Sequence, residues 1–145
     1  MHQAEQQVTT KKNTKFPTVL LAAANISENI KSEIIDTLEE GLSHLDIKIL
    51  RSENDFSSLE KSHMIVLFEN DIDLLKKAWS HGVVPITQAF DPSIVNYNPN
   101  TESGNSFVYE SKNYWEIFAA IVRACETYKF PYDWKFIVRS CTKSS

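Results

Sequence analysis

Glu69 is the residue of this 145-residue chain whose type and position best suit ligand chemistry. It directly follows the apolar run Met64 to Phe68, which is predicted to form a strand covered on both faces. Ligands of open α/β sheets bind at the carboxyl ends of the strands, so a carboxylate there could contact a polar substrate. Glu69 could instead be an acidic cap of a helix over Asn70 to Ser80, because the positive end of the helix dipole favours negative charge.

Two histidines and two cysteines are the other reactive side chains. His63 and His81 flank predicted strands, and either could act as an acid or a base near neutral pH. Neither has a nucleophile or an orienting carboxylate at motif spacing, which favours a role as a polar strand end. Cys125 lies on an apolar helical stripe and Cys141 near the end of the chain, so neither is predicted to be catalytic. No Cys/His cluster has the spacing of a zinc site.

Alternating strands and helices are predicted to position these residues. The short apolar runs predict strands over 18–24, 47–50, 64–68, 83–86 and 106–109. Apolar residues at helical spacing predict helices over 27–44, 70–80, 114–128 and 132–139, with a long loop over 90–105. The alternation favours a doubly wound, Rossmann-like parallel sheet of about five strands in three α/β/α layers.

Composition and charge narrow the class of protein. A net charge of −4 provides no broad basic surface for nucleic acid. Residues 1–16 are too polar for a secretory signal and are predicted to be a flexible tail before one domain over 17–145. No apolar run approaches the roughly 20 residues needed to span a bilayer. We therefore expect a cytoplasmic protein that has no membrane or nucleic-acid partner.

Several short motifs occur in a fixed order in the second half of the chain. Glu69 leads into the sequence AWSHGVVPI over 78–86, and Tyr97-Asn98-Pro99 follows in the long loop. Gly104-Asn105-Ser106-Phe107 then precedes an Ala-rich helix. In this order, the segment from Glu69 to about Arg139 resembles the end of the C-terminal, nucleotide-sugar-binding domain of GT-B glycosyltransferases, closest to starch and glycogen synthases.

The resemblance implies a sugar-nucleotide site. Glu69 matches a family carboxylate that contacts the donor sugar, so the ligand would be ADP-glucose or UDP-glucose. The family's glycine turn corresponds to Gly104, Asn105 and Ser106, whose backbone amides could face that ligand. These three residues could equally form a structural turn before the last strand.

The chain departs from the family where the donor phosphates are held. The family's Arg and Lys after the first strand have no counterpart except Lys31, which could equally be a solvated lysine of its helix. The segment Ala89 to Pro92 replaces a glycine pair, and its Asp91 places negative charge where phosphate should lie. The acceptor-binding domain of the family is also absent, so we assign no catalytic residue and expect an incomplete active site.

We therefore expect a glycosyltransferase-like domain that is not catalytically complete alone. It would bind a nucleotide sugar or a glucan weakly, or pair with a second chain that supplies the missing domain; as an enzyme it would transfer a hexosyl group to a glucan.

The alternative is a non-catalytic protein-interaction module that binds a partner or a second copy through its aromatic C-terminal region. Core packing is the competing explanation for these aromatic residues, which are Trp115, Phe130, Tyr132, Trp134 and Phe136. A flavodoxin- or receiver-like domain is less favoured, because Ala22 to Asn25 stand where an acidic pocket would follow the first strand.

Overall fold

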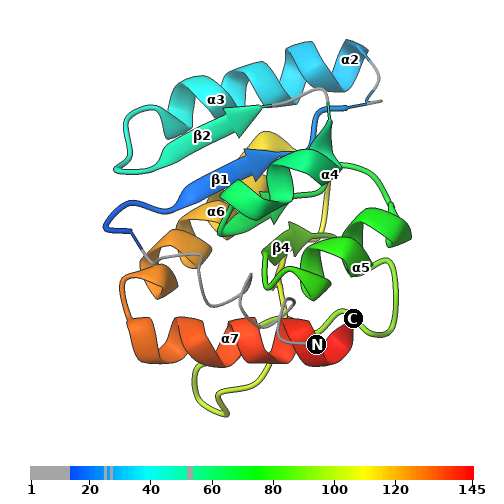
Figure 1. Cartoon of the computed structure of the whole chain (residues 1–145). Coiled ribbons are helices and arrows are strands. Elements are labelled where there is room, and N and C mark those ends of the chain that lie inside the picture. Colours follow the sequence, from blue (N-terminus) through cyan, green and yellow to red (C-terminus); the bar gives the residue numbers. More distant parts are fainter. Residues whose placement is uncertain (1–13, 25, 27, 52–53) are drawn as a thin grey trace.

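A single parallel sheet organises the chain (Figure 1). The computed structural model describes residues 14–24, 26, 28–51 and 54–145, apart from the side chains of residues 29, 31 and 32. Within this part the five strands lie in the order β2-β1-β3-β4-β5, so the direction of winding reverses between β1 and β3. Their bounds are β1 Thr18–Leu21, β2 Lys48–Arg51, β3 Met64–Val66, β4 Val84–Thr87 and β5 Phe107–Val108.

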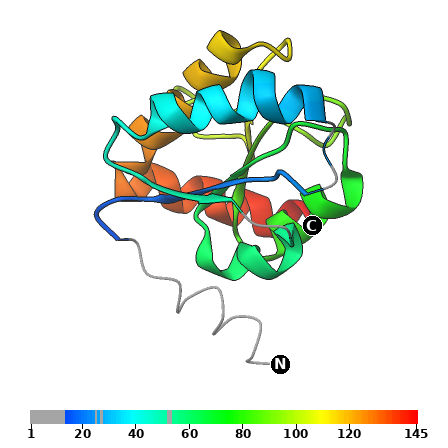
Figure 2. The same ribbon diagram turned by 90° about the horizontal axis from the view of Figure 1, so that it is seen from above.

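Helices cover both faces of this sheet, which confirms the predicted three-layer, Rossmann-like α/β/α fold (Figures 1 and 2). One face carries α2 (Glu28–Ile30), the π-helical turn η1 (Lys31–Ile35), α3 (Asp36–Leu42) and α6 (Tyr114–Tyr128). The other face carries α4 (Asp55–Ser58), the 3-10 turn η2 (Leu59–Lys61), α5 (Ile72–Ser80) and α7 (Pro131–Ser144). The strand order is that of flavodoxin-type sheets and differs from the 3-2-1-4-5-6 order of dinucleotide-binding Rossmann domains.

The apolar runs form strands because both faces of the inner strands are covered. Val19 to Leu21 of β1 and all of β3 have no solvent exposure, as a parallel sheet between two helical layers requires. The edge strand β2 differs, because Lys48 and Arg51 are exposed. Arg51 donates to Asp36 at 2.7 Å and to Glu39 at 2.9 Å, which ties this edge to α3.

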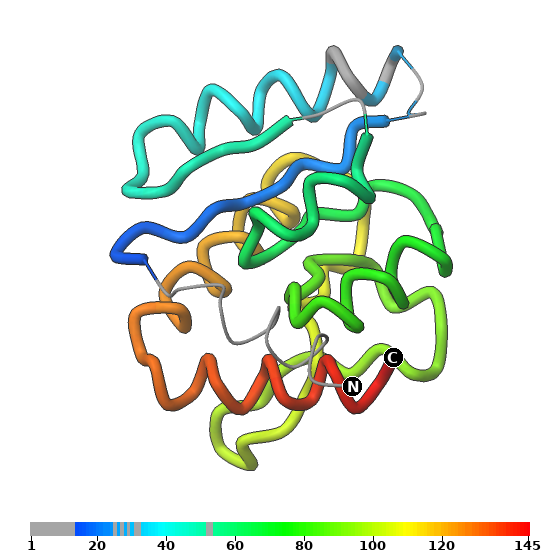
Figure 3. Tube along the Cα trace, viewed as in Figure 1, coloured from blue at the N-terminus to red at the C-terminus, as the bar shows by residue number. Residues whose placement is uncertain are grey.

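The last helix is longer than predicted, because α7 begins at Pro131 and continues to Ser144. Proline suits the first position of a helix, where its missing N–H would have no helical partner. The loop over 90–105 passes beside α7 (Figure 3), and the Tyr97 hydroxyl donates to the Asp133 carboxylate at 3.1 Å. Burial and this hydrogen bond raise the pKa of Tyr97 to about 12, so the hydroxyl remains a donor.

Part of the predicted tail lies against the domain. Residues 1–13 lie outside the described residues, but the Tyr128 hydroxyl donates to the carbonyl of Thr14 at 2.7 Å. The carbonyl of Pro17 accepts from the backbone N–H of Lys48 at 2.8 Å.

Among the helices of the described ranges, none combines the length and apolarity that crossing a bilayer requires.

Substitution of Gly104 tests the backbone conformation of the loop over 90–105. Its φ of +127° disfavours any side chain, and a Cβ there would lie 2.4 Å from the Cα of Tyr97. We expect Gly104→Ala to lower the free energy of unfolding by about 2–4 kcal/mol in urea denaturation, because backbone atoms cannot move aside cheaply. Gly41→Ala is the control: its Cβ would meet side-chain atoms alone, the hydroxyl end of Tyr114 and the ring of Phe118, so we expect a change of less than about 1 kcal/mol. Equal effects of the two substitutions would contradict this description of the loop.

Candidate functional site

The carboxyl ends of β3, β4 and β5 meet at one edge of the sheet, where a hollow of about 440 Å³ lies. Parallel strands end at the same edge, so residues far apart in the sequence come together there. Seven residues line the hollow: Asn70, Gln88, Ala89, Phe90, Val108, Tyr109 and Glu110. We call this hollow the carboxyl-edge cleft.

Glu69 adjoins the carboxyl-edge cleft through its neighbour Asn70, and its side chain is 47% exposed. Its Oε1 lies 3.4 Å from Nζ of Lys112, which comes from the loop after β5. The alternative of a helix cap does not hold, because Asp71 caps α5 by accepting from the backbone N–H of Leu74 at 3.0 Å. The Glu69 carboxylate is therefore free of a capping role.

The loop that carries Lys112 is held by the start of α6. The side chain of Asn113 caps the helix by accepting from the N–H of Glu116 at 3.0 Å. The Glu116 carboxylate in turn accepts from the backbone N–H of Ser111 at 2.9 Å and of Glu110 at 3.1 Å. The Ser111 hydroxyl and these N–H groups lower the pKa of Glu116, which favours its charged form. This reciprocal cap gives Lys112 a defined position opposite Glu69.

Two hydrogen bonds fix the wall of the carboxyl-edge cleft. The Tyr109 hydroxyl donates to the carbonyl of Leu67 at 2.6 Å, and burial raises the pKa of Tyr109 above its ordinary value. The Gln88 amide donates to the carbonyl of Glu110 at 2.9 Å, which ties the end of β4 to the segment after β5. The wall is therefore formed before any ligand arrives, a condition that reduces the entropy lost on binding.

Asp55 places a buried carboxyl group at the end of β1. The residue is 6% exposed, and its Oδ1 has no hydrogen-bond partner among the described residues. Burial raises the pKa of Asp55 to about 6, against the opposing effect of a hydrogen bond from the backbone N–H of Ala24, and the charge of Asp71 adds to the rise. No acidic pocket was expected after the first strand, because Ala22 to Asn25 follow it. The buried carboxyl group of Asp55 comes instead from α4, which lies more than 30 residues later in the sequence.

The predicted residues Gly104, Asn105 and Ser106 lie at the opposite end of the sheet from Glu69. They precede β5 and so stand at its amino end, where they form the turn that was the alternative prediction. The N–H of Asn105 donates to the carbonyl of Val95 at 2.9 Å, so it is already used within the protein.

The side chain of Asn105 is also fully engaged in structure. It accepts from the N–H of Val95 and donates to the carbonyl of Ser93 and the hydroxyl of Ser144, each at 2.9 Å. Its backbone carbonyl accepts from the indole of Trp79 at 3.1 Å. Asn105 therefore joins the long loop, α5 and α7, and the structure does not bring it to the carboxyl-edge cleft.

His63 and Cys125 do not line the carboxyl-edge cleft. The backbone of Lys31 belongs to η1, while its side chain lies outside the described atoms, so its predicted role stays a prediction. His63 is buried, and its Nδ1 accepts from the backbone N–H of Thr18 at 3.0 Å, as expected of a polar strand end. Burial raises the pKa of Cys125 to about 12, which makes a thiolate nucleophile unfavourable.

Charges of both signs lie around the carboxyl-edge cleft. Glu110 lines the cleft and Glu69 at its rim faces Lys112, while the Arg123 guanidinium donates to the carbonyl of the lining residue Val108 at 2.8 Å. Asp91 directly follows the lining residue Phe90, and hydrogen bonds from Ser93 lower the pKa of its carboxyl group. Sugar hydroxyls could donate to these carboxylates and accept from these cations. Across the described part of the chain, no three His, Cys, Asp or Glu side chains gather to hold a metal.

The aromatic residues of the C-terminal third divide between core and surface. Trp134 is 2% exposed and stacks on Phe107 with 6.5 Å between ring centroids. Phe130 and Tyr132 are 60% and 67% exposed at the corner between α6 and α7, and Trp115 is 73% exposed at the other end of α6. Core packing therefore explains Trp134, and Phe136 is half-buried with its ring edge-on to Tyr132 at 5.1 Å between centroids, whereas core packing does not explain Trp115, Phe130 and Tyr132.

Asp55 makes stability depend on pH in a direction opposite to that of a salt-bridged acid. The folded state binds its proton more tightly than the unfolded state, so this stabilisation is present at low pH and is lost as pH rises through about 6. Relative to the wild type, we expect Asp55→Asn to gain roughly 2 kcal/mol in unfolding free energy from about pH 4 to about pH 8. Urea denaturation measures this, with exposed Asp73→Asn in the first turn of α5 as the control. Parallel pH profiles of Asp55→Asn and the wild type would contradict the buried carboxyl.

Comparisons with known proteins do not identify a family for this chain. The chain matches no protein-family model, and no curated protein is significantly similar to it. The structure therefore establishes a Rossmann-like sheet with a cleft at the carboxyl ends of β3, β4 and β5.

Proposed function

We propose that the chain is a glycosyltransferase-like domain that binds the sugar part of a glucan or a nucleotide sugar weakly and does not transfer it alone. The observation that carries the proposal is the exposed carboxylate of Glu69 beside Lys112 at the rim of the carboxyl-edge cleft. This is the end of the sheet at which open α/β proteins bind ligands. It is also the position that the resemblance to starch and glycogen synthases assigns to a sugar contact.

The chemistry of the carboxyl-edge cleft suits hydroxyl groups. A carboxylate accepts hydrogen bonds from hydroxyls, an ammonium group donates to them, and charge-assisted bonds of this kind are about twice as strong as neutral ones. Gln88 and Tyr109 hold the wall through their own hydrogen bonds, so a sugar would meet a preformed surface. Lys112 already faces Glu69 and Arg123 already donates to the carbonyl of Val108, which leaves less positive charge for a diphosphate, so the proposal favours a glucan over ADP-glucose or UDP-glucose.

Calorimetry with maltoheptaose, UDP-glucose and ADP-glucose tests this function. We expect millimolar binding of maltoheptaose, a free energy of about −4 kcal/mol. Glu69→Gln should weaken it about tenfold, since hydrogen bonds to charged groups contribute about 1.5–3 kcal/mol and the exposed ion pair with Lys112 contributes little.

The matched control is Glu60→Gln, an exposed glutamate on η2 far from the carboxyl ends of the strands. We expect it to bind maltoheptaose as the wild type does. The proposal fails if none of the three ligands binds at millimolar concentration, or if both substitutions weaken binding equally.

The second candidate function is a non-catalytic interaction module, favoured by the exposed aromatic corner of Phe130 and Tyr132. Aromatic side chains are enriched at interface hot spots, and two neighbouring ones exposed by more than half offer an anchor. A second chain that carries the acceptor-binding domain of a glycosyltransferase, or a second copy of this chain, would cover them. Trp115 lies about 20 Å away along α6 at 1.5 Å per residue, so it belongs to a different surface.

Light scattering on the pure protein tests this second function. If the corner joins two copies, we expect a dimer whose dissociation constant rises at least tenfold in Phe130→Ser/Tyr132→Ser, a loss of about 1.4 kcal/mol or more. Trp115→Ser should leave it unchanged. A strict monomer at all concentrations excludes the second copy as occupant and leaves only a different chain.

A further inference from the structure

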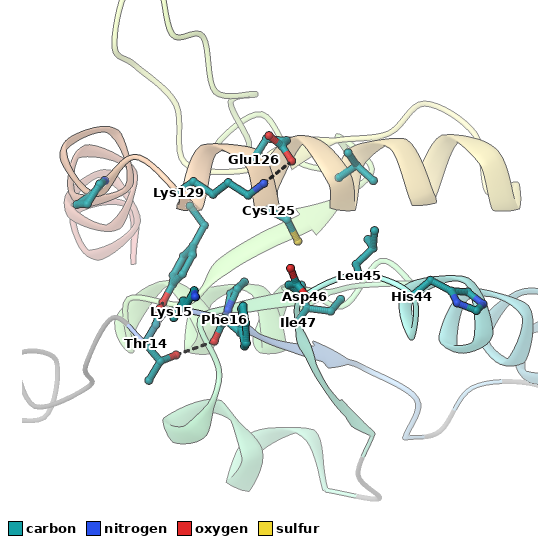
Figure 4. A pocket seen from close by; sticks show the side chains of 14 residues that line it. Thr14, Lys15, Phe16, His44, Leu45, Asp46, Ile47, Cys125, Glu126 and Lys129 are labelled. Carbon is teal, nitrogen blue, oxygen red and sulfur yellow. Dashed lines mark hydrogen bonds and ion pairs between the residues drawn. The ribbon is translucent and has the colours of Figure 1, made fainter.

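A groove of about 610 Å³ lies at the opposite end of the molecule from the carboxyl-edge cleft (Figure 4). It runs between α6 on one side and the segments 14–17 and 44–47 on the other, with the Cys125 side chain directed into it. Its size falls within the roughly 300–1,000 Å³ of small-molecule sites. Its wall is mainly apolar and includes Phe16, Leu45, Ile47, Val122, Cys125 and Tyr128. We call it the α6 groove.

A second hollow, of about 410 Å³, adjoins the α6 groove at the amino ends of β1, β2 and β3. Three lysines line it from three separate segments: Lys15 before β1, Lys48 at the start of β2 and Lys61 at the end of η2. No carboxylate lines it, and none of the three lysines forms an ion pair with a residue that the structure describes. We call it the lysine hollow.

The two hollows share one wall, formed by Thr14, Lys15 and Phe16. Lys15 marks the junction, since its Nζ lies 5.5 Å from the centroid of the Phe16 ring. The shared residues are held in place, because the carbonyl of Thr14 accepts from the hydroxyl of Tyr128 at 2.7 Å. An apolar trough therefore opens directly onto three lysines that form no ion pair within the part of the chain that the structure describes.

We propose that this combined site binds a single-chain anionic amphiphile, with its alkyl chain in the α6 groove and its phosphate or carboxylate headgroup in the lysine hollow. The apolar wall supplies the hydrophobic contribution, about 0.8 kcal/mol for each buried methylene group. The lysines supply charge complementarity in a protein whose net charge of −4 would otherwise repel an anion. The proposal does not depend on the function of the carboxyl-edge cleft, which lies at the other ends of the strands.

The charges on the α6 groove set the direction in which the ligand lies. Glu126 on its rim is neutralised by Lys129 at 3.0 Å, while Asp46 has no ion-pair partner in the described part of the chain. An anionic headgroup is therefore repelled from the Asp46 rim and attracted to Lys48 and Lys61. The protein thus distinguishes the two ends of an amphiphile by charge as well as by apolarity.

Titration of the full chain with octyl phosphate, 1-octanol and inorganic phosphate tests the proposal, because the three probes separate the whole ligand, its tail and its headgroup. We expect octyl phosphate, as monomer, to bind at least tenfold more tightly than either of the others. Backbone amide shifts should appear at 45–47 and 122–126 and be absent at Asn70 and 88–90. Such a pattern would separate this site from the carboxyl-edge cleft even if no sugar binds there.

Substitutions identify the headgroup site. Lys48→Gln/Lys61→Gln should weaken octyl phosphate at least tenfold and leave 1-octanol unchanged, whereas the control Lys77→Gln/Lys135→Gln, two exposed lysines elsewhere, should change neither. The proposal is overturned if 1-octanol binds as tightly as octyl phosphate, or if the two double variants behave alike. It is also overturned by binding only to anionic phosphatidylglycerol vesicles, or by a dimer that shifts the same amides without any amphiphile.

Discussion

The structure depends on one constraint, which is that a parallel sheet must be covered by helices on both faces. β1 and β3 lie at the centre of the sheet with no exposed apolar side chain, and their burial accounts for the continuous apolar runs of the sequence. Helical segments cross from the carboxyl end to the amino end of successive strands up to β4, and the loop over 90–105 makes the last crossing, so the two edges formed by the strand ends remain open. Both candidate sites lie at such edges, one at each end of the strands.

This constraint explains why the fold was predictable from the sequence while much of the site was not. The five strands and the main helices follow from apolar spacing, and only their ends moved, as for α7, which continues to Ser144. Glu69 was found because it directly follows a strand. Gly104 to Ser106 were placed at the same site by resemblance, although residues that precede a strand must lie at its amino end. No sequence motif marks Asp55 or Lys112. Burial in the folded protein sets the environment of Asp55, and the cap of α6 positions Lys112.

The two edges of the sheet differ in charge and so in the ligands they suit. The carboxyl edge carries Glu69 and Glu110 beside Lys112 and Arg123, and this mixture of charges suits the proposed hydroxyl ligand. The amino edge gathers three lysines beside an apolar groove. The proposed binding of a sugar without its transfer is consistent with the carboxylates that this edge carries.

The most direct measurement is a residue-resolved NMR titration of the full chain with maltoheptaose. The account predicts saturable amide shifts at Asn70, Gln88 and Glu110 to Lys112, with Asn105 and Ser106 unmoved because they serve the turn before β5. Shifts centred on Asn105 and Ser106, or no shift at the carboxyl edge at saturating sugar, would contradict it.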